Sequence, residues 1–228
     1  MKKIAQDYYA DLKIEYAKKI RQLVPRYDDM VQCMVELLQH SRPRTVLDIG
    51  AGVGNVTQTI LNALPETRVT AVDACEDMVA EARRALGPYG DRVTIVQADA
   101  AGFTPEAPFD AVFSNLVLHN VPFAPKHTLL RSIIGWLNPG GVFLWGDMIR
   151  HADPSLQEYF VRQRKEFALA AGCAKELVAA NFEKEETEDY PFTLQETLQA
   201  AKQAGFREAN SVWMHDTFAV FVLVAEAM

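Results

Sequence analysis

Short apolar runs alternate with segments of helical periodicity from Thr45 onward, and this alternation limits the folds open to the chain. Apolar and β-branched residues predict five strands, at 45–49, 68–72, 92–97, 109–114 and 141–146. Between them, periodicity predicts helices at 55–64, 77–86 and 126–137, the last ended by the Asn-Pro-Gly-Gly turn at 138–141. Helical crossovers join neighbouring parallel strands. The sequence therefore predicts an α/β fold with a doubly wound, mostly parallel sheet.

Helical segments flank this predicted core. We expect two N-terminal helices, at 2–24 and 27–40, and one long or two shorter helices at 154–180. Thr193 and Glu196 have the spacing of a capping box, which predicts a further helix that ends at Gly205. Two last strands, at 211–214 and 218–225, are expected to form a hairpin. They bring the predicted sheet to seven strands.

The composition is that of an ordinary globular protein, with 49% hydrophobic and 23% charged residues among 228. We therefore expect one domain. Its expected parts are an N-terminal helical segment (1–43), a core (44–150), a helical insertion (151–192) and a final helix with a strand hairpin (193–228).

Charge and cysteine content disfavour several classes of protein. A net charge of −7, without a basic patch, opposes binding to nucleic acid. No uncharged stretch approaches the length of a membrane span, so we expect a cytoplasmic protein without a membrane partner. The three cysteines are far apart and indicate neither a disulfide framework nor a metal site.

The strongest local signal is the sequence DIGAGVG at 48–54, where an apolar strand runs into glycines at alternate positions and then into a helix. Glycine lets the backbone approach a ligand closely, and the helix that follows offers unpaired N–H groups. The next predicted strand ends at Asp73, 23 residues after Gly50, where a carboxylate can accept hydrogen bonds from both ribose hydroxyls. Together these features predict a ribose-containing ligand, either a nicotinamide nucleotide or S-adenosylmethionine (SAM).

The glycine spacing separates these two ligands. A dinucleotide fingerprint would place its third glycine at residue 55, which is Asn55. The run at 48–54 instead resembles the DxGxGxG motif of class I SAM-dependent methyltransferases, which have a Rossmann-like fold. The resemblance implies that Asp48 helps to orient the methionine ammonium, that SAM is the cofactor, and that S-adenosylhomocysteine (SAH) is the product.

Three further segments resemble the same family in the expected order. They are VQADA at 96–100, FDAVFSNLVLH at 109–119 and LNPGG at 137–141, and the first would recognise adenine. The cofactor-binding residues that the resemblance implies are Asp48, Gly50, Ala51, Gly52, Asp73, Ala74, Met78, Asp99, Ala100 and Asn115. Methyl transfer needs in-line alignment more than a base. If a base acts, His119 and Asp147 are the candidates.

The flanks at 23–30 and 204–220 show a narrower resemblance, to the tRNA wobble-uridine carboxymethyltransferase and its small-molecule methyltransferase relatives. That tRNA enzyme holds the carboxylate of a carboxylated SAM with an arginine. The matching segment here, NFEKEE at 181–186, is acidic, which favours ordinary SAM. The leading hypothesis is a methyltransferase acting on a small molecule. The alternatives are a tRNA-modifying (carboxy)methyltransferase and a nonenzymatic SAM-binding regulator.

Residues 1–30 and 151–192 lie outside the cofactor-binding core and are expected to form a lid that selects the acceptor. The acidic stretch at 183–189 has little apolar content, so we expect burial to hold it only weakly. Apolar helices outside the core also suggest a homodimer.

Overall fold

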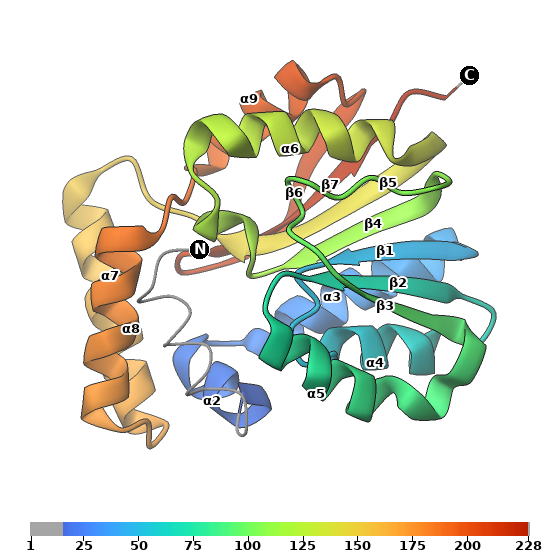
Figure 1. Ribbon diagram of the computed structural model, residues 1–228. Helices are drawn as coiled ribbons and strands as arrows, with labels where there is room; N and C mark the ends of the chain where they lie inside the picture. The colour runs from blue at the N-terminus through green and yellow to red at the C-terminus, as the bar shows by residue number, and fades with distance from the viewer. Residues whose placement is uncertain (1–15, 228) are drawn as a thin grey trace.

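A computed structural model describes residues 16–227. They contain a seven-stranded sheet with the order β3-β2-β1-β4-β5-β7-β6 (Figure 1). The strands are β1 (Thr45–Ile49), β2 (Arg68–Asp73), β3 (Val93–Gln97), β4 (Phe109–Asn115), β5 (Leu137–Met148), β6 (Glu208–His215) and β7 (Phe218–Val224). The first five pair in parallel, and β7 pairs antiparallel with both β5 and β6. The predicted Rossmann-like, mostly parallel fold is confirmed.

Helices cover both faces of the sheet. In Figure 1, α3 (Tyr27–Ser41), α4 (Asn55–Ala63) and α5 (Glu76–Leu86) lie on one side, and α6 (Phe123–Gly135) and α9 (Leu194–Ala204) on the other. Each strand residue faces one layer or the other, so Val46 packs with α3 and α4 while Leu47 packs with α6 and α9. Both faces are therefore buried, which explains why the parallel strands are nearly continuous apolar runs.

The predicted helical insertion consists of two helices, α7 (Pro154–Ala170) and α8 (Lys175–Glu188), at one end of the sheet (Figure 1). Beside them lies α2 (Tyr16–Leu23), and Gln22 Nε2 donates to the carbonyl of Ala171 at 2.8 Å. The part of the predicted first helix at 2–15 lies outside the described residues. None of the helices described between residues 16 and 227 combines the length and the hydropathy that crossing a bilayer requires.

The acidic stretch at 183–189 packs against the protein despite its low apolar content. Helix α8 continues to Glu188, and Phe182, Lys184 and Glu188 are buried. Some of its charges are paired: Arg164, whose side chain is 3% exposed, donates to both carboxylate oxygens of Glu185 at 2.8 and 2.9 Å. Ion pairing with neighbouring elements holds this segment where apolar burial alone would not.

The Asn-Pro-Gly-Gly turn at 138–141 was expected between a helix and a strand, and the structure places it elsewhere. Helix α6 runs from Phe123 to Gly135, and β5 already begins at Leu137, so the turn forms an irregularity inside the strand. The register between β4 and β5 shifts there, and Gly140 has a φ of +73°. Pro139 has no N–H to donate to the hydrogen bonds between β4 and β5. The pairing of these two strands is therefore interrupted at the turn, inside β5.

The C-terminal predictions are confirmed. Thr193 and Glu196 form a capping box, with Thr193 N donating to Glu196 Oε2 at 2.8 Å and Glu196 N to Thr193 Oγ1 at 3.1 Å. Gly205, with a φ of +104°, ends α9, and β6 and β7 form the expected hairpin. The division of one domain into four segments stays a prediction.

Candidate functional site

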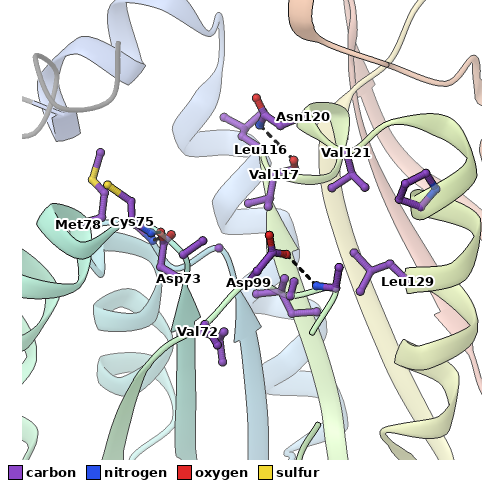
Figure 2. Close-up of a pocket in the computed structure, with 18 of the residues that line it drawn as sticks. Val72, Asp73, Cys75, Met78, Asp99, Leu116, Val117, Asn120, Val121 and Leu129 are labelled. Carbon is purple, nitrogen blue, oxygen red and sulfur yellow. Dashed lines mark hydrogen bonds between the residues drawn. The ribbon is translucent and has the colours of Figure 1, made fainter. Parts of the chain in front are cut away.

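A pocket of about 480 Å³ opens at the carboxyl ends of the parallel strands (Figure 2). In open α/β sheets ligands bind at this edge, and the volume is within the usual range for small-molecule sites. The strand ends and the segments that follow them line it through Ile49, Gly50, Gly52, Val72, Asp73, Ala74, Cys75, Met78, Ala98, Asp99, Ala100, Ala101, Asn115, Leu116, Val117, Asn120, Val121, Pro122, Pro125, Leu129, Glu188 and Tyr190.

The glycine turn after β1 forms part of the pocket floor. Gly50 has a φ of +71°, and a Cβ built on it would lie 2.3 Å from a methyl carbon of Val117. Gly52 has a φ of +56°, yet a Cβ there would meet no atom of residues 16–227 within 4 Å. Gly50 is therefore needed for protein packing, whereas Gly52 leaves space on the side of the pocket.

Asp73, at the end of β2, is held by backbone donors. Gly52 N donates to Asp73 Oδ2 and Cys75 N donates to Asp73 Oδ1, both at 2.8 Å. Burial raises the pKa of Asp73, and these hydrogen bonds oppose the rise. The two bonds fix the carboxylate at the pocket wall, where it can accept further hydrogen bonds from a ligand.

Asp99 follows β3 and is fixed in a similar way. Its Oδ1 accepts the N–H of Ala101 at 2.9 Å, as the dashed line in Figure 2 shows. Met78, on the first turns of α5, is 3% exposed and lines the pocket near Asp73. This side of the pocket thus combines two oriented carboxylates with an apolar wall.

Asn115 ends β4, and its buried Oδ1 has no hydrogen-bond partner within residues 16–227. Gly146 lies beside it on β5, and a Cβ at this glycine would be 2.9 Å from Asn115 Oδ1 and 2.5 Å from Met34 Sδ. Glycine at 146 therefore makes room for the amide. Asn115 also lines the pocket, so its side chain can take part in binding a ligand.

Asp48 does not line the pocket. It is 2% exposed and accepts a hydrogen bond of 2.5 Å from Thr57 Oγ1 on α4. Burial, opposed by the hydrogen bond from Thr57, raises the pKa of Asp48 to about 7. The structure therefore places this carboxylate beneath the glycine turn, and Ala51 is likewise absent from the pocket lining.

His119 and Asp147 lie together, but neither lines the pocket. His119 Nδ1 is 2.5 Å from Asp147 Oδ1, and Asp147 Oδ2 also accepts from Trp145 Nε1 at 2.8 Å. Burial by itself raises the pKa of Asp147, but the charge of His119 and its hydrogen bond hold that pKa below its ordinary value. The Nδ2 of Asn120 lies 3.1 Å from Nε2 of His119, on the other edge of the ring.

The lining residues that the sequence did not indicate include Asn120, Glu188 and Tyr190, whose side chains are polar. Asn120 directly follows His119, the last residue of the motif at 109–119, so that motif could have indicated Asn120 as a site residue. Glu188 and Tyr190 belong to a segment almost 70 residues later. The N–H of Tyr190 donates to the carbonyl of His119 at 2.6 Å, which brings that segment onto the 3-10 turn η3 (Leu118–Asn120). No local pattern indicates such a contact.

The strand order, the antiparallel last strands and the pocket at the glycine turn together define a Rossmann-like methyltransferase fold. Residues 46–141 match the family described as "Methyltransferase domain". This central part of the chain is a methyltransferase domain of the class I SAM-dependent type. SAM is the cofactor of this family.

Relatives of the chain fall into more than one functional type. Carboxy-S-adenosyl-L-methionine synthase of Campylobacter concisus is 27% identical over 205 residues, covering 89% of this chain and 87% of that protein. Trans-aconitate 2-methyltransferase of Rhodopseudomonas palustris is 39% identical over 100 residues, covering 44% of this chain and 37% of that protein. The chain therefore spans well under half of the second relative.

Solved structures share the fold at low identity. The 1,6-didemethyltoxoflavin N1-methyltransferase of Burkholderia thailandensis, solved with 1,6-didemethyltoxoflavin and SAH bound, has a TM-score of 0.66 and 20% identity. The match covers 98% of this chain and 88% of that one. Several other methyltransferase structures are longer, and the chain spans 52% to 60% of them.

Proposed function

We propose that the protein transfers the methyl group of SAM to a small-molecule acceptor. One observation carries the proposal: the fixed carboxylates of Asp73 and Asp99 face a pocket of about 480 Å³ that the end of α8 also lines. Such a pocket suits a cofactor and a small acceptor together. When bound, SAM supplies an electrophilic methyl group.

The residues of the pocket fit this cofactor. Asp73 would accept the ribose hydroxyls, Asp99 the adenine amine, and Met78 would pack on the base. The unpaired Oδ1 of Asn115 would accept from the methionine ammonium. The open space above Gly52 leaves room for the cofactor. Gly50, Ala74 and Ala100 would contribute backbone, and the proposed role of Asp48 is to fix the first turn of α4 through Thr57.

We assign His119 and Asp147 a positioning role instead of a catalytic one. Both nitrogens of the imidazole already face protein partners, Asp147 and Asn120. The pair fixes η3, whose last residue Asn120 lines the pocket. Alignment of the acceptor with the methyl group would then provide much of the rate enhancement.

Three observations favour SAM over a carboxylated SAM and a small acceptor over tRNA. Lys184 is the one cation in the segment 181–186, and it donates to Asp189 Oδ1 at 2.5 Å and to Asn120 Oδ1 at 2.7 Å. It is therefore already engaged within the protein, which favours SAM over a carboxylated SAM. The net charge of −7 favours a small acceptor over tRNA. The names of the trans-aconitate and didemethyltoxoflavin enzymes also denote small acceptors.

Titration calorimetry with SAH and a thermal melt test the proposal. SAH at a hundred times its Kd should stabilise the fold by about 2.7 kcal/mol, because it binds only the folded state. NAD should give no shift. A shift with NAD and none with millimolar SAH would refute the cofactor assignment.

Two further measurements separate the alternatives. Bulk tRNA should cause no electrophoretic shift at physiological salt, and a shift would favour the tRNA-modifying alternative. SAH release from SAM in the presence of a metabolite library should reveal turnover. Tight SAH binding without turnover on any acceptor would indicate the nonenzymatic regulator.

A further inference from the structure

Glu188 has an unusual environment for a carboxylate. The residue is 9% exposed, and its Oε2 is buried without a hydrogen-bond partner among the described residues. An unpaired buried carboxylate oxygen is costly, so such a group persists where the fold holds it in place and a ligand can satisfy it. Glu188 also lines the pocket.

Residues before and after Glu188 in the sequence make contacts that fix its position. Lys184, one turn earlier on α8, binds the next residue, Asp189, at 2.5 Å, and both side chains are about 5% exposed or less. Lys184 also donates to Asn120. Two residues after Glu188, the N–H of Tyr190 donates to His119 O. These contacts hold Glu188 against η3 and the pocket wall.

The position of Glu188 places it away from the nucleoside end. Asp73 and Met78 lie on the β2 and α5 side of the pocket, whereas Asn120 and Val121 lie on the opposite side in Figure 2. Glu188 joins this second side through the bonds of its neighbours to η3. If Asp73 holds the ribose, the wall with Asn120 and Glu188 faces the reacting end of the ligand.

The charges of the lining residues have one sign. The acidic residues of the pocket lining are Asp73, Asp99 and Glu188. Among the described residues, the lining includes no lysine, arginine or histidine. A carboxylate or phosphate on an acceptor would meet no cation from the part of the chain that the structure describes, and it would face a buried acid. A neutral or cationic acceptor with an N–H or O–H would supply the donor that Glu188 lacks.

We infer that Glu188 recognises the acceptor, and that the acceptor is an uncharged or cationic molecule that presents an N–H or O–H group. This inference rests on the proposed methyl transfer. Glu188 accepts the proton that the acceptor nitrogen or oxygen loses as it bonds to the methyl carbon, while the electron pair of the broken C–S bond remains on sulfur. Glu188 ends neutral, and SAH leaves as an uncharged thioether.

Ligand binding tests this inference without knowledge of the acceptor. Sinefungin is an SAH analogue with a primary amine where SAM carries its transferring methyl group, so its ammonium probes the position assigned to Glu188. Calorimetry should show that the wild type binds sinefungin about tenfold more tightly than SAH, the usual scale for a charged hydrogen bond. In Glu188→Gln this preference should fall to about twofold or less.

Glu186→Gln is the matched control, because Glu186 lies on the same helix and is exposed. It should keep the sinefungin preference, and both variants should bind SAH as the wild type does. Equal preferences in Glu188→Gln and Glu186→Gln would overturn the inference while leaving the proposed function intact. Absence of SAH binding in the wild type would overturn the proposed function itself.

Carboxy-S-adenosylmethionine places a negative charge where sinefungin has a positive one, because it differs from SAM by one carboxylate at the methyl position. It should bind the wild type about tenfold more weakly than SAM, and Glu188→Gln should remove most of the difference. Tighter binding of the carboxylated compound to the wild type would overturn the inference. It would also favour the carboxylated cofactor.

Discussion

Nδ1 of His119 lies 2.5 Å from Oδ1 of Asp147, and the side chains of both residues are at most 10% exposed. The pair joins the end of β5 to η3, beneath one wall of the pocket. This placement agrees with the proposed role of the pair, which is to position Asn120.

Removal of the imidazole should therefore destabilise the fold. His119→Ala leaves the carboxylate of Asp147 buried without its main partner, and we expect a loss of about 3 kcal/mol or more in the free energy of unfolding. Urea denaturation measures it. The exposed His40→Ala serves as the control and should change stability by less than about 0.5 kcal/mol. An equal effect of the two substitutions would contradict the positioning role.

Asp73→Ala should weaken SAH binding by about 1.5 to 3 kcal/mol, the range for hydrogen bonds to a charged group. Calorimetry gives the dissociation constant directly. The control is Asp91→Ala, because the Asp91 side chain is 81% exposed and pairs with Arg68 on the surface. An unchanged dissociation constant in Asp73→Ala would mean that this carboxylate does not hold the ribose.

Gly52→Ala and Gly172→Ala form a matched pair. Both glycines have positive φ, +56° and +80°, and an added Cβ at either would meet no atom of the described residues closer than 3.8 Å. Each variant should lose about 1 to 2 kcal/mol of stability from the left-handed backbone. Only Gly52→Ala should weaken SAH binding, by about tenfold or more, because its methyl group enters the pocket. Similar SAH binding by both variants would place the ligand elsewhere.

The raised pKa of Asp48 predicts how stability depends on pH. A carboxyl group whose folded pKa is about 7 binds its proton more tightly than in the unfolded chain, so its contribution is lost as pH rises through 7. Between pH 5 and pH 8 this loss is about 3 kcal/mol. Asp48→Asn should remove it, because an amide does not ionise. Urea unfolding at both pH values, compared between wild type and variant, measures the difference. Equal losses in the two proteins would show that Asp48 ionises without cost.

The lid hypothesis predicts a pattern of hydrogen exchange. Since Glu188 and Tyr190 line the pocket, SAH should suppress local opening and slow exchange in the segment 184–190 as well as at the glycine turn. The first turns of α9 lie away from the lining and serve as an internal reference. Slower exchange confined to residues 50–54 and to the surroundings of Asp73 and Asp99 would make the insertion a rigid scaffold.

The sequence alone determined the order of strands and helices and the strand ends that carry Gly50, Gly52, Asp73 and Asp99. These features depend on local causes. The period of the apolar residues determines whether a segment forms a helix or a strand. A backbone position with positive φ favours glycine. The last residue of each parallel strand lies at the same edge of the sheet. That is why the sequence predicts that the glycine turn and Asp73 line a ligand pocket.

Only the tertiary structure decided where the charged residues lie. Asp48 belongs to the glycine motif, yet the packing of α4 turns it beneath the turn and onto Thr57. The acidic stretch at 183–189 looked unable to pack, but Arg164, from another helix, neutralises Glu185. Glu188 reaches the pocket because the bonds of its neighbours to Asn120 and His119 join segments almost 70 residues apart. Burial and pairing of charges depend on partners that are distant in sequence, and no local pattern encodes them.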